Sequence, residues 1–282
     1  MTTVVQSLPY GKSPVVLSAE LPPFALGQYT IRECSRCGLL FQEEALDDRE
    51  TAEFYRAKLG VALERLGRRS LQAHAHIVED VLIARKLIGR DDPLVLDFGA
   101  GECTWGGTAH ALGCRVICQD VHDAIAECAA NYGLKAVTLE DIADDSLDYI
   151  NADQVFEHLA RPLEQLRELV PKLRRGGIIK ISTPGDSRMK SRLWKTDFAA
   201  LMPREFEQKF SALAPLQHLQ LFSARSLQAM GARTGVEPLR VSPFTSLATT
   251  VLVDSGRQLN RVMRNPLKRW LARGTWQWFR RT

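Results

Sequence analysis

The sequence has no apolar run approaching the ~18 residues that a membrane-spanning helix needs. Its first residues, Met1 to Ser7, lack a basic stretch leading into an apolar one, so we expect no secretory signal. Cysteine is also scarce, with six among 282 residues, and the spacing resembles no disulfide framework. We therefore expect a cytoplasmic protein whose thiols are reduced.

Acidic residues are missing from the last part of the sequence. Residues 257–282 include eight Lys or Arg residues and neither Asp nor Glu. Because these eight cations exceed the net charge of +4 by four, the rest of the chain is mildly acidic. The basic balance is local, so it does not predict a nucleic-acid partner.

Composition and periodicity indicate a folded α/β protein. Hydrophobic residues make up 45% and charged residues 25% of the chain, as in ordinary globular proteins. From residue 94 onward, short apolar runs alternate with helical patterns, which predicts parallel strands joined by right-handed crossovers. We expect these strands near 94–97, 115–120, 135–138, 147–151 and 178–181, with 236–241 and 247–253 as a closing hairpin.

A glycine-rich turn follows the first expected strand. Asp97, Gly99 and Gly101 stand between that strand and a helical segment, where glycines let the backbone pass close to a ligand. Asp120 ends the second strand, 19 residues after Gly101. That is about the spacing at which an acid accepts hydrogen bonds from ribose hydroxyls. The turn and the acid together indicate a nucleoside cofactor, the alternative being a structural turn with two surface acids.

The acid at position 97 separates two cofactors that such a turn could hold. In a nicotinamide site, Asp97 would lie near two phosphates, and Thr104 replaces the glycine that packs beneath them. S-adenosylmethionine instead carries an ammonium group, which a carboxylate can bind by charge and hydrogen bonding. The residues therefore favour S-adenosylmethionine. A nicotinamide-dependent oxidoreductase and a non-catalytic binding scaffold are the alternatives.

Five segments resemble, in order and spacing, successive motifs of the class I S-adenosylmethionine-dependent methyltransferases. They are Val95–Gly101, Cys118–Asp120, Leu147–Ile150, Val155–Leu159 and Leu173–Gly177. The stretch from Ile181 to Ser223 is similar to a bacterial subgroup with a cysteine knuckle, which includes sugar and other small-molecule methyltransferases. The resemblance covers about residues 30–254 and implies O- or C-methylation of a small-molecule or glycan-like acceptor.

This resemblance implies an α/β fold with a Rossmann-like, mostly parallel seven-stranded sheet and helices on both faces. Residues 93–254 would form the methyltransferase domain. Ahead of it we expect an N-terminal knuckle segment at 1–47 and a helical cap at 48–92. A basic extension would follow at 255–282.

The resemblance also assigns roles to single residues. Asp97, Gly99 and Gly101 would hold the methionine end of the cofactor, Asp120 the ribose, and Thr138 and Leu139 the adenine, while Asp153 and Gln154 would lie beside the transferred methyl. Ala100 and Val121 are further expected cofactor contacts. Thr138 stands where the family often has a carboxylate. Trp194 is expected to contact the acceptor.

Two histidines fall on the acceptor side of the implied site. The unperturbed pKa of histidine lies close to working pH, so either His158 or His218 could take a proton from the acceptor. His218 is the preferred base because it follows an irregular stretch with Pro203 and Pro215, as a mobile cover would. His158 could instead order the start of a helix.

One Cys-x-x-Cys pair, Cys34 and Cys37, forms half of a zinc ribbon. Structural zinc needs four ligands. His74 and His76 could complete the set, but they stand two apart in a predicted helix and so face different ways. We expect no metal there, the alternative being a site shared across a dimer.

The C-terminal segment has the pattern of an amphipathic helix. One face would carry the apolar positions Leu267, Trp270, Leu271, Gly274 and Trp278, and the other the cations. Two interpretations are open. The helix could touch the inner membrane face through residues 260–282, which would favour a lipid-linked glycan as acceptor. Alternatively, it could dock on its own domain.

Overall fold

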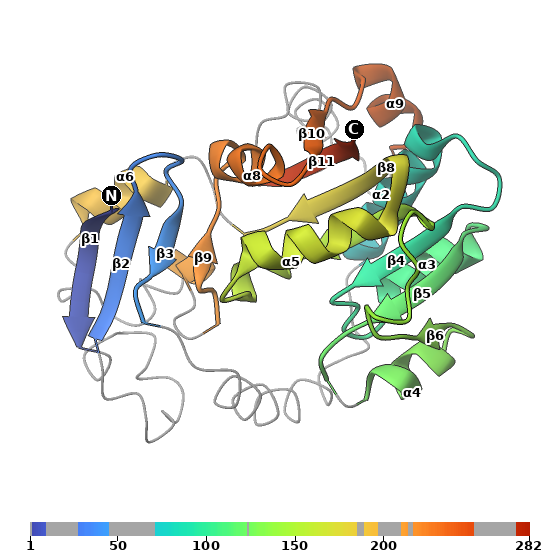
Figure 1. Ribbon diagram of the computed structural model, residues 1–282, viewed down its shortest axis with the longest axis horizontal. Helices are drawn as coiled ribbons and strands as arrows, with labels where there is room; N and C mark the ends of the chain where they lie inside the picture. The colour runs from blue at the N-terminus through green and yellow to red at the C-terminus, as the bar shows by residue number, and fades with distance from the viewer. Residues whose placement is uncertain are drawn as a thin grey trace.

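The computed structural model describes residues 2–9, 28–44, 71–122, 124–184, 189–196, 210–213, 217–250 and 275–282. These residues form a large sheet with helices on both faces and a smaller sheet beside it (Figure 1). Residues 48–70 of the helical cap expected at 48–92, and the first part of the basic extension, lie outside the described residues.

The large sheet has seven strands. Their spatial order is β10 (Val236–Leu239), β11 (Trp276–Arg281), β8 (Leu173–Ser182), β7 (Leu147–Asp153), β4 (Leu94–Phe98), β5 (Arg115–Gln119) and β6 (Lys135–Ala136). The five strands from β8 to β6 are parallel, and β11 runs antiparallel to both its neighbours. The predicted mostly parallel seven-stranded sheet is confirmed.

Successive residues of the central strands face opposite layers of the core. On β7, Tyr149 packs in one hydrophobic cluster and Ile150 in the other, as the period of two in a strand requires. Helices cover both faces: α2 (Leu71–Ile88), α3 (Thr104–Ala111) and α4 (Ile125–Ala130) on the Tyr149 side, and α5 (Pro162–Leu169) and α8 (Ala224–Gly231) on the Ile150 side. The fold therefore has three layers.

The smaller sheet is antiparallel and joins distant parts of the chain. It contains β1 (Thr2–Pro9), β2 (Gln28–Cys34), β3 (Leu40–Gln42) and β9 (Gln220–Leu221). The turn between β2 and β3 lies where the knuckle is expected, and in it the Gly38 amide donates to the Cys34 carbonyl at 2.8 Å. Pairing of Leu40 with Leu221 attaches the segment before α8 to the N-terminal strands.

Short elements complete the description. They are the helical turns η3 (Phe156–His158), η4 (Val170–Lys172) and η6 (Ser211–Leu213), and the helices α6 (Met189–Lys195) and α9 (Pro243–Ala248). Residues 175–177 lie within β8. Within the described part of the chain, no helix is both long and apolar enough to cross a membrane.

The predicted hairpin of 236–241 with 247–253 is wrong. Residues 243–248 form α9, because Ser242 and Pro243 are a strong helix start: the Ser242 hydroxyl accepts from the Thr245 amide at 3.0 Å, and proline suits the first turn. β10 pairs instead with β11, Val236 lying opposite Arg281.

The amphipathic helix predicted through Trp278 is also wrong for residues 276–281. These residues form β11, which lies between β8 and β10 and buries Trp278 and Phe279. Aromatic residues favour strands, and a strand covered on both faces is apolar on both. Trp278 is therefore part of the core rather than a membrane anchor. Residues 251–274 lie outside the described residues.

We expect Phe279→Ala to lower the free energy of unfolding by about 3–5 kcal/mol, because it leaves a cavity in a central strand. Phe279 is 0% exposed, whereas Phe244 on α9 is 83% exposed. Phe244→Ala is the matched control and should change stability by less than about 0.5 kcal/mol. Equal midpoints for both variants in urea unfolding would contradict the placement of β11.

Candidate cofactor and acceptor site

The glycine turn lies where the strand order of the large sheet reverses. From β4 the chain adds β5 and β6 on one side and then crosses to β7 and β8 on the other. Connections diverge at such a point and leave a crevice at the carboxyl ends of the strands, where ligands bind in sheets of this kind. The fold therefore brings the residues that follow β4, β5 and β7 to one edge of the sheet.

Contacts on two sides hold the turn itself. Gly99 has a φ of +69°, and a Cβ atom there would lie 2.3 Å from Val155 Cγ2, so only glycine fits. The amides of Gly99 and Ala100 donate to the Gln119 carbonyl at 2.8 and 3.1 Å. A Cβ atom built on Gly101 would meet no described atom within 4 Å. The turn is thus fixed at its base and open next to Gly101.

The carboxyl group of Asp97 is buried beneath the turn. One oxygen accepts from the Gly106 amide at 2.9 Å and the other from the Asn151 side chain at 2.9 Å. Burial raises the pKa of Asp97 to about 7, although both hydrogen bonds act in the opposite direction. A cation bound nearby would favour the ionised form of this carboxyl.

Asp120, the expected ribose ligand, also anchors the turn. Its Oδ2 accepts from the Gly101 amide at 2.8 Å, and its Oδ1 accepts from the amides of Val121 and His122 at 2.7 and 3.3 Å. The His122 ring Nε2 donates to the Gly101 carbonyl at 3.0 Å. Sequence analysis missed this contact of His122. The side chain of Val121 is 88% exposed, which leaves an apolar surface at the end of β5.

At the expected adenine contact Thr138, a carboxylate stands close by. Thr138 donates from its amide and from its hydroxyl to Asp141 Oδ2, both at 3.0 Å, and these two hydrogen bonds hold the pKa of Asp141 below its usual value. Leu139 is half-buried beside them. Sequence analysis missed Asp141, although the Thr-x-x-Asp spacing is typical of such a turn.

The end of β7 presents Asp153 and Gln154 to the same edge. Gln154 adopts a φ of +57°, which is uncommon for a residue other than glycine, and its amide donates to the Ser182 carbonyl at 2.9 Å. The Ser182 hydroxyl donates to Asp153. Below them, Lys180 pairs with Asp80 of α2 and lies 3.9 Å from Asp153. A buried cation thus supports the acid expected beside the methyl group.

The structure brings His158 and His218 together, with ring centroids 4.9 Å apart. The Nδ1 atom of His158 lies 2.8 Å from the Gln217 carbonyl, and that of His218 lies 2.9 Å from the Ala212 carbonyl. A carbonyl can only accept, so each Nδ1 carries a proton, and in the neutral form of each ring the lone pair lies on Nε2.

The segment of His218 is held by the smaller sheet. The Gln42 side chain donates to the His218 carbonyl at 2.9 Å, and the Gln42 amide donates to the Leu219 carbonyl at 2.9 Å. Residues 197–209 and 214–216, which include Pro203 and Pro215 of the expected cover, lie outside the described residues. His218 itself is anchored by β3.

Glu157 completes a cluster with the two histidines. It is 0% exposed, and its Oε1 lies 3.9 Å from His158 Nε2. Neither carboxylate oxygen has a hydrogen-bond partner among the residues that the structure describes. Burial raises the pKa of Glu157 to about 8, and the nearby Asp153 carboxylate adds to this. Sequence analysis overlooked Glu157, although it directly precedes His158.

Trp194, expected to contact the acceptor, is not brought to the glycine turn. It is 52% exposed on α6, and α6 lies beside β1 at one end of the molecule, while β4 and α3 lie at the other (Figure 1). Its contact with the acceptor stays a prediction.

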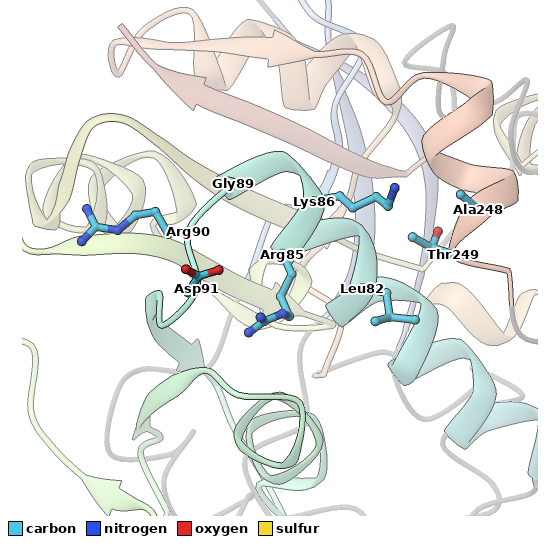
Figure 2. A pocket seen from close by; sticks show the side chains of 8 residues that line it. All are labelled: Leu82, Arg85, Lys86, Gly89, Arg90, Asp91, Ala248 and Thr249. Atoms are coloured by element: carbon cyan, nitrogen blue, oxygen red, sulfur yellow. The ribbon is translucent and has the colours of Figure 1, made fainter.

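A cavity of about 350 Å³ lies elsewhere, between the end of α2 and α9 (Figure 2). It is lined by Leu82, Arg85, Lys86, Gly89, Arg90, Asp91, Ala248 and Thr249. Residues 89–91 lead into the amino end of β4, so this cavity is at the edge of the sheet opposite to the glycine turn. Arg85 and Arg90 also have protein partners, Cys114 and Asp148. The cavity is not the cofactor crevice.

Two solved methyltransferase structures are similar to this chain. The 1,6-didemethyltoxoflavin-N1-methyltransferase of Burkholderia thailandensis, with bound 1,6-didemethyltoxoflavin and S-adenosylhomocysteine, is 17% identical with a TM-score of 0.51, and the match covers 90% of this chain and 96% of that one. An S-adenosylmethionine-dependent methyltransferase of Archaeoglobus fulgidus is 17% identical with a TM-score of 0.43, over 73% and 92% of the two chains. No curated protein matches the chain.

A family model described as a methyltransferase domain matches residues 72–241, well over half of the sequence. The match begins in α2, includes the glycine turn, Asp120 and the cluster at 157, 158 and 218, and ends just after β10. This match excludes the alternative of a nicotinamide-dependent oxidoreductase. The chain therefore belongs to the methyltransferase domain family and is an S-adenosylmethionine-dependent methyltransferase.

Proposed function

We propose that this enzyme methylates a small-molecule acceptor bound between the glycine turn and the cluster of Glu157, His158 and His218. One observation carries the proposal: η3 begins two residues after Gln154, and the β3–β9 pairing brings His218 to the same place. This supports a site in which ionisable side chains face the acceptor. The Burkholderia enzyme with a similar fold acts on 1,6-didemethyltoxoflavin, a small molecule, which supports this acceptor class.

The cofactor supplies an electrophilic methyl group on its sulfonium sulfur. We propose that Asp97, below the turn, attracts the ammonium group of the methionine end and that Asp120 accepts from the ribose hydroxyls. The exposed Val121 would pack against the adenine, and Asp141 would accept from its amino group. The remaining expected contacts are Gly99, Ala100 and Gly101 along the methionine end, Thr138 and Leu139 around the adenine, and Asp153 and Gln154 beside the methyl group.

Methyl transfer needs in-line alignment of acceptor, methyl carbon and sulfur, so orientation supplies much of the rate. An oxygen or carbon nucleophile must also lose a proton. We propose that His158 and His218 serve this step jointly. Their rings are in contact, and in the neutral form each ring has a lone pair on Nε2 that can accept a proton. We therefore assign the proton transfer to the pair and not to one histidine.

A glycan acceptor at a membrane is less favoured than a free small molecule. That expectation depended on an interfacial helix through Trp278, and Trp278 is a buried residue of β11.

Asp120→Ala should weaken binding of S-adenosylhomocysteine by about 1.5–3 kcal/mol, because it removes charge-assisted hydrogen bonds to the ribose and releases Gly101. Asp92, an exposed acid that pairs with Arg115, offers the control Asp92→Ala, which should leave the affinity unchanged. Titration calorimetry measures both. Unchanged affinity in Asp120→Ala would remove Asp120 from the cofactor site.

Cofactor affinity should depend on pH through Asp97, whose pKa is raised to about 7. An ammonium group binds the ionised carboxyl, so affinity should rise between pH 5.5 and 7, by tenfold per pH unit at most, and level off above pH 7. Asp97→Asn should bind weakly with no such slope, its folding being checked by circular dichroism. The same slope in wild type and variant would mean that another group titrates.

His218→Ala should lower turnover by ~10² or more while S-adenosylhomocysteine affinity stays nearly constant. His158→Ala should disturb both, since η3 adjoins the residues beside the methyl group. The measurement is release of S-adenosylhomocysteine with panels of hydroxylated, heterocyclic and glycan acceptors. Wild-type turnover in His218→Ala from pH 6 to 9 would remove His218 from the reaction.

A further inference from the structure

We infer that Glu157, His158 and His218 form a binding site for one divalent transition-metal ion, for which Zn²⁺ is the best match. One ligand atom from each residue lies within 4.8 Å of the other two. The residues come from η3 and from the segment before β9, about 60 positions apart in sequence. The ion-binding inference depends on these contacts alone, whereas its role in catalysis rests on the proposed function.

The carboxylate of Glu157 points to a missing cation. It is fully buried, and both of its oxygens are without a hydrogen-bond partner in the described part of the chain. Burying such a group costs several kcal/mol unless it is paired or coordinates a metal. The group lies against imidazole rings, with His158 Nε2 at 3.9 Å. A metal ion between them would give this carboxylate a partner.

Both imidazole rings are oriented by hydrogen bonds to the backbone, as the rings of metal-binding histidines are. In each ring Nδ1 donates to a backbone carbonyl, Gln217 for His158 and Ala212 for His218. Metal-binding histidines usually make such a bond, because it fixes the tautomer and directs the lone pair of the other nitrogen at the ion. The Gln42 side chain holds the His218 carbonyl, and β3 pairs with the two residues of β9, so the second ring is positioned by the fold.

The spacing fits a small ion. Zinc holds nitrogen and oxygen ligands at about 2.0–2.2 Å, which places tetrahedral ligand atoms about 3.4 Å apart. Distances of 3.9 Å and up to 4.8 Å require each atom to move by less than about 1 Å. Two histidines and one carboxylate are a donor set of catalytic zinc, with a fourth position open to substrate. Calcium and magnesium, which prefer oxygen ligands, fit less well.

An acceptor hydroxyl that takes the open position would lose its proton to solvent more readily, because a divalent ion lowers the pKa of an oxygen bound to it. As that oxygen bonds to the methyl carbon, the bond from carbon to the sulfonium sulfur breaks and its electron pair stays on sulfur. The products are a methyl ether and S-adenosylhomocysteine. This would be the joint role of His158 and His218.

Purified full-length protein, stripped with EDTA, should take up one Zn²⁺ per chain in equilibrium dialysis, and Co²⁺ should give the visible absorption of a site with nitrogen and oxygen ligands. Glu157→Gln, His158→Ala and His218→Ala should each weaken uptake at least tenfold. His110→Ala on α3 and the double variant Cys34→Ser, Cys37→Ser are controls that should bind as wild type. Circular dichroism confirms that each variant is folded, and Glu157→Gln keeps the shape of the side chain.

Two results would overturn the inference: no stoichiometric ion in the wild type, or uptake that is lost in the cysteine variant and kept in the three cluster variants. Calorimetry with S-adenosylhomocysteine on the stripped protein separates this inference from the proposed function. Cofactor binding that persists without metal supports the methyltransferase site whether or not zinc binds. With an active acceptor, loss of turnover in EDTA and recovery with Zn²⁺ would support the catalytic role.

Discussion

The buried carboxyl group of Asp97 joins the three elements that define the cofactor crevice. It lies at the end of β4 that leads into the turn, next to Phe98, and accepts from Asn151 of β7 and from Gly106 of α3, so it connects the two strands to the helix that leaves the turn. A buried acid without these donors would be strongly destabilising. Together with the Gln119 carbonyl and Asp120, this group positions the glycine turn. The fold and the cofactor site therefore depend on the same hydrogen bonds.

The acceptor side depends on a different contact, the pairing of β3 with β9. Through it, residues 40–42 hold the backbone of residues 218–221 by strand pairing and by the Gln42 side chain. His218 then lies against His158, which the large sheet carries on η3. The N-terminal strands thus contribute to the site without supplying a ligand themselves. The knuckle at Cys34 and Cys37 closes the hairpin that makes this contact, so it has a structural role with or without metal.

The sequence predicts the parallel half of the sheet well, because strand, glycine turn and terminal acid follow one another within local stretches such as 94–120. It predicts the last strand poorly. The aromatic residues of Trp276–Phe279 fit a helical face as well as a strand, and only long-range pairing with β8 decides between the two. Glu157 and His218 meet for a similar reason, since their contact depends on strands about 180 residues apart in sequence. Asp141 is the exception, because its hydrogen bond with Thr138 is local and the Thr-x-x-Asp spacing alone predicts it.

Because β11 follows β10 by a long stretch of sequence, the large sheet is completed late in synthesis. β8 and β10 flank a gap in the sheet until residues 276–281 have left the ribosome, roughly 40 residues after β10. During that interval both strands expose unpaired edges and the apolar surface that Trp278 and Phe279 later cover. The strands of the cofactor crevice, β4, β5 and β7, are all synthesised before this interval, whereas the core is complete only when β11 has paired with β8 and β10. β11 is therefore the strand that closes the hydrophobic core.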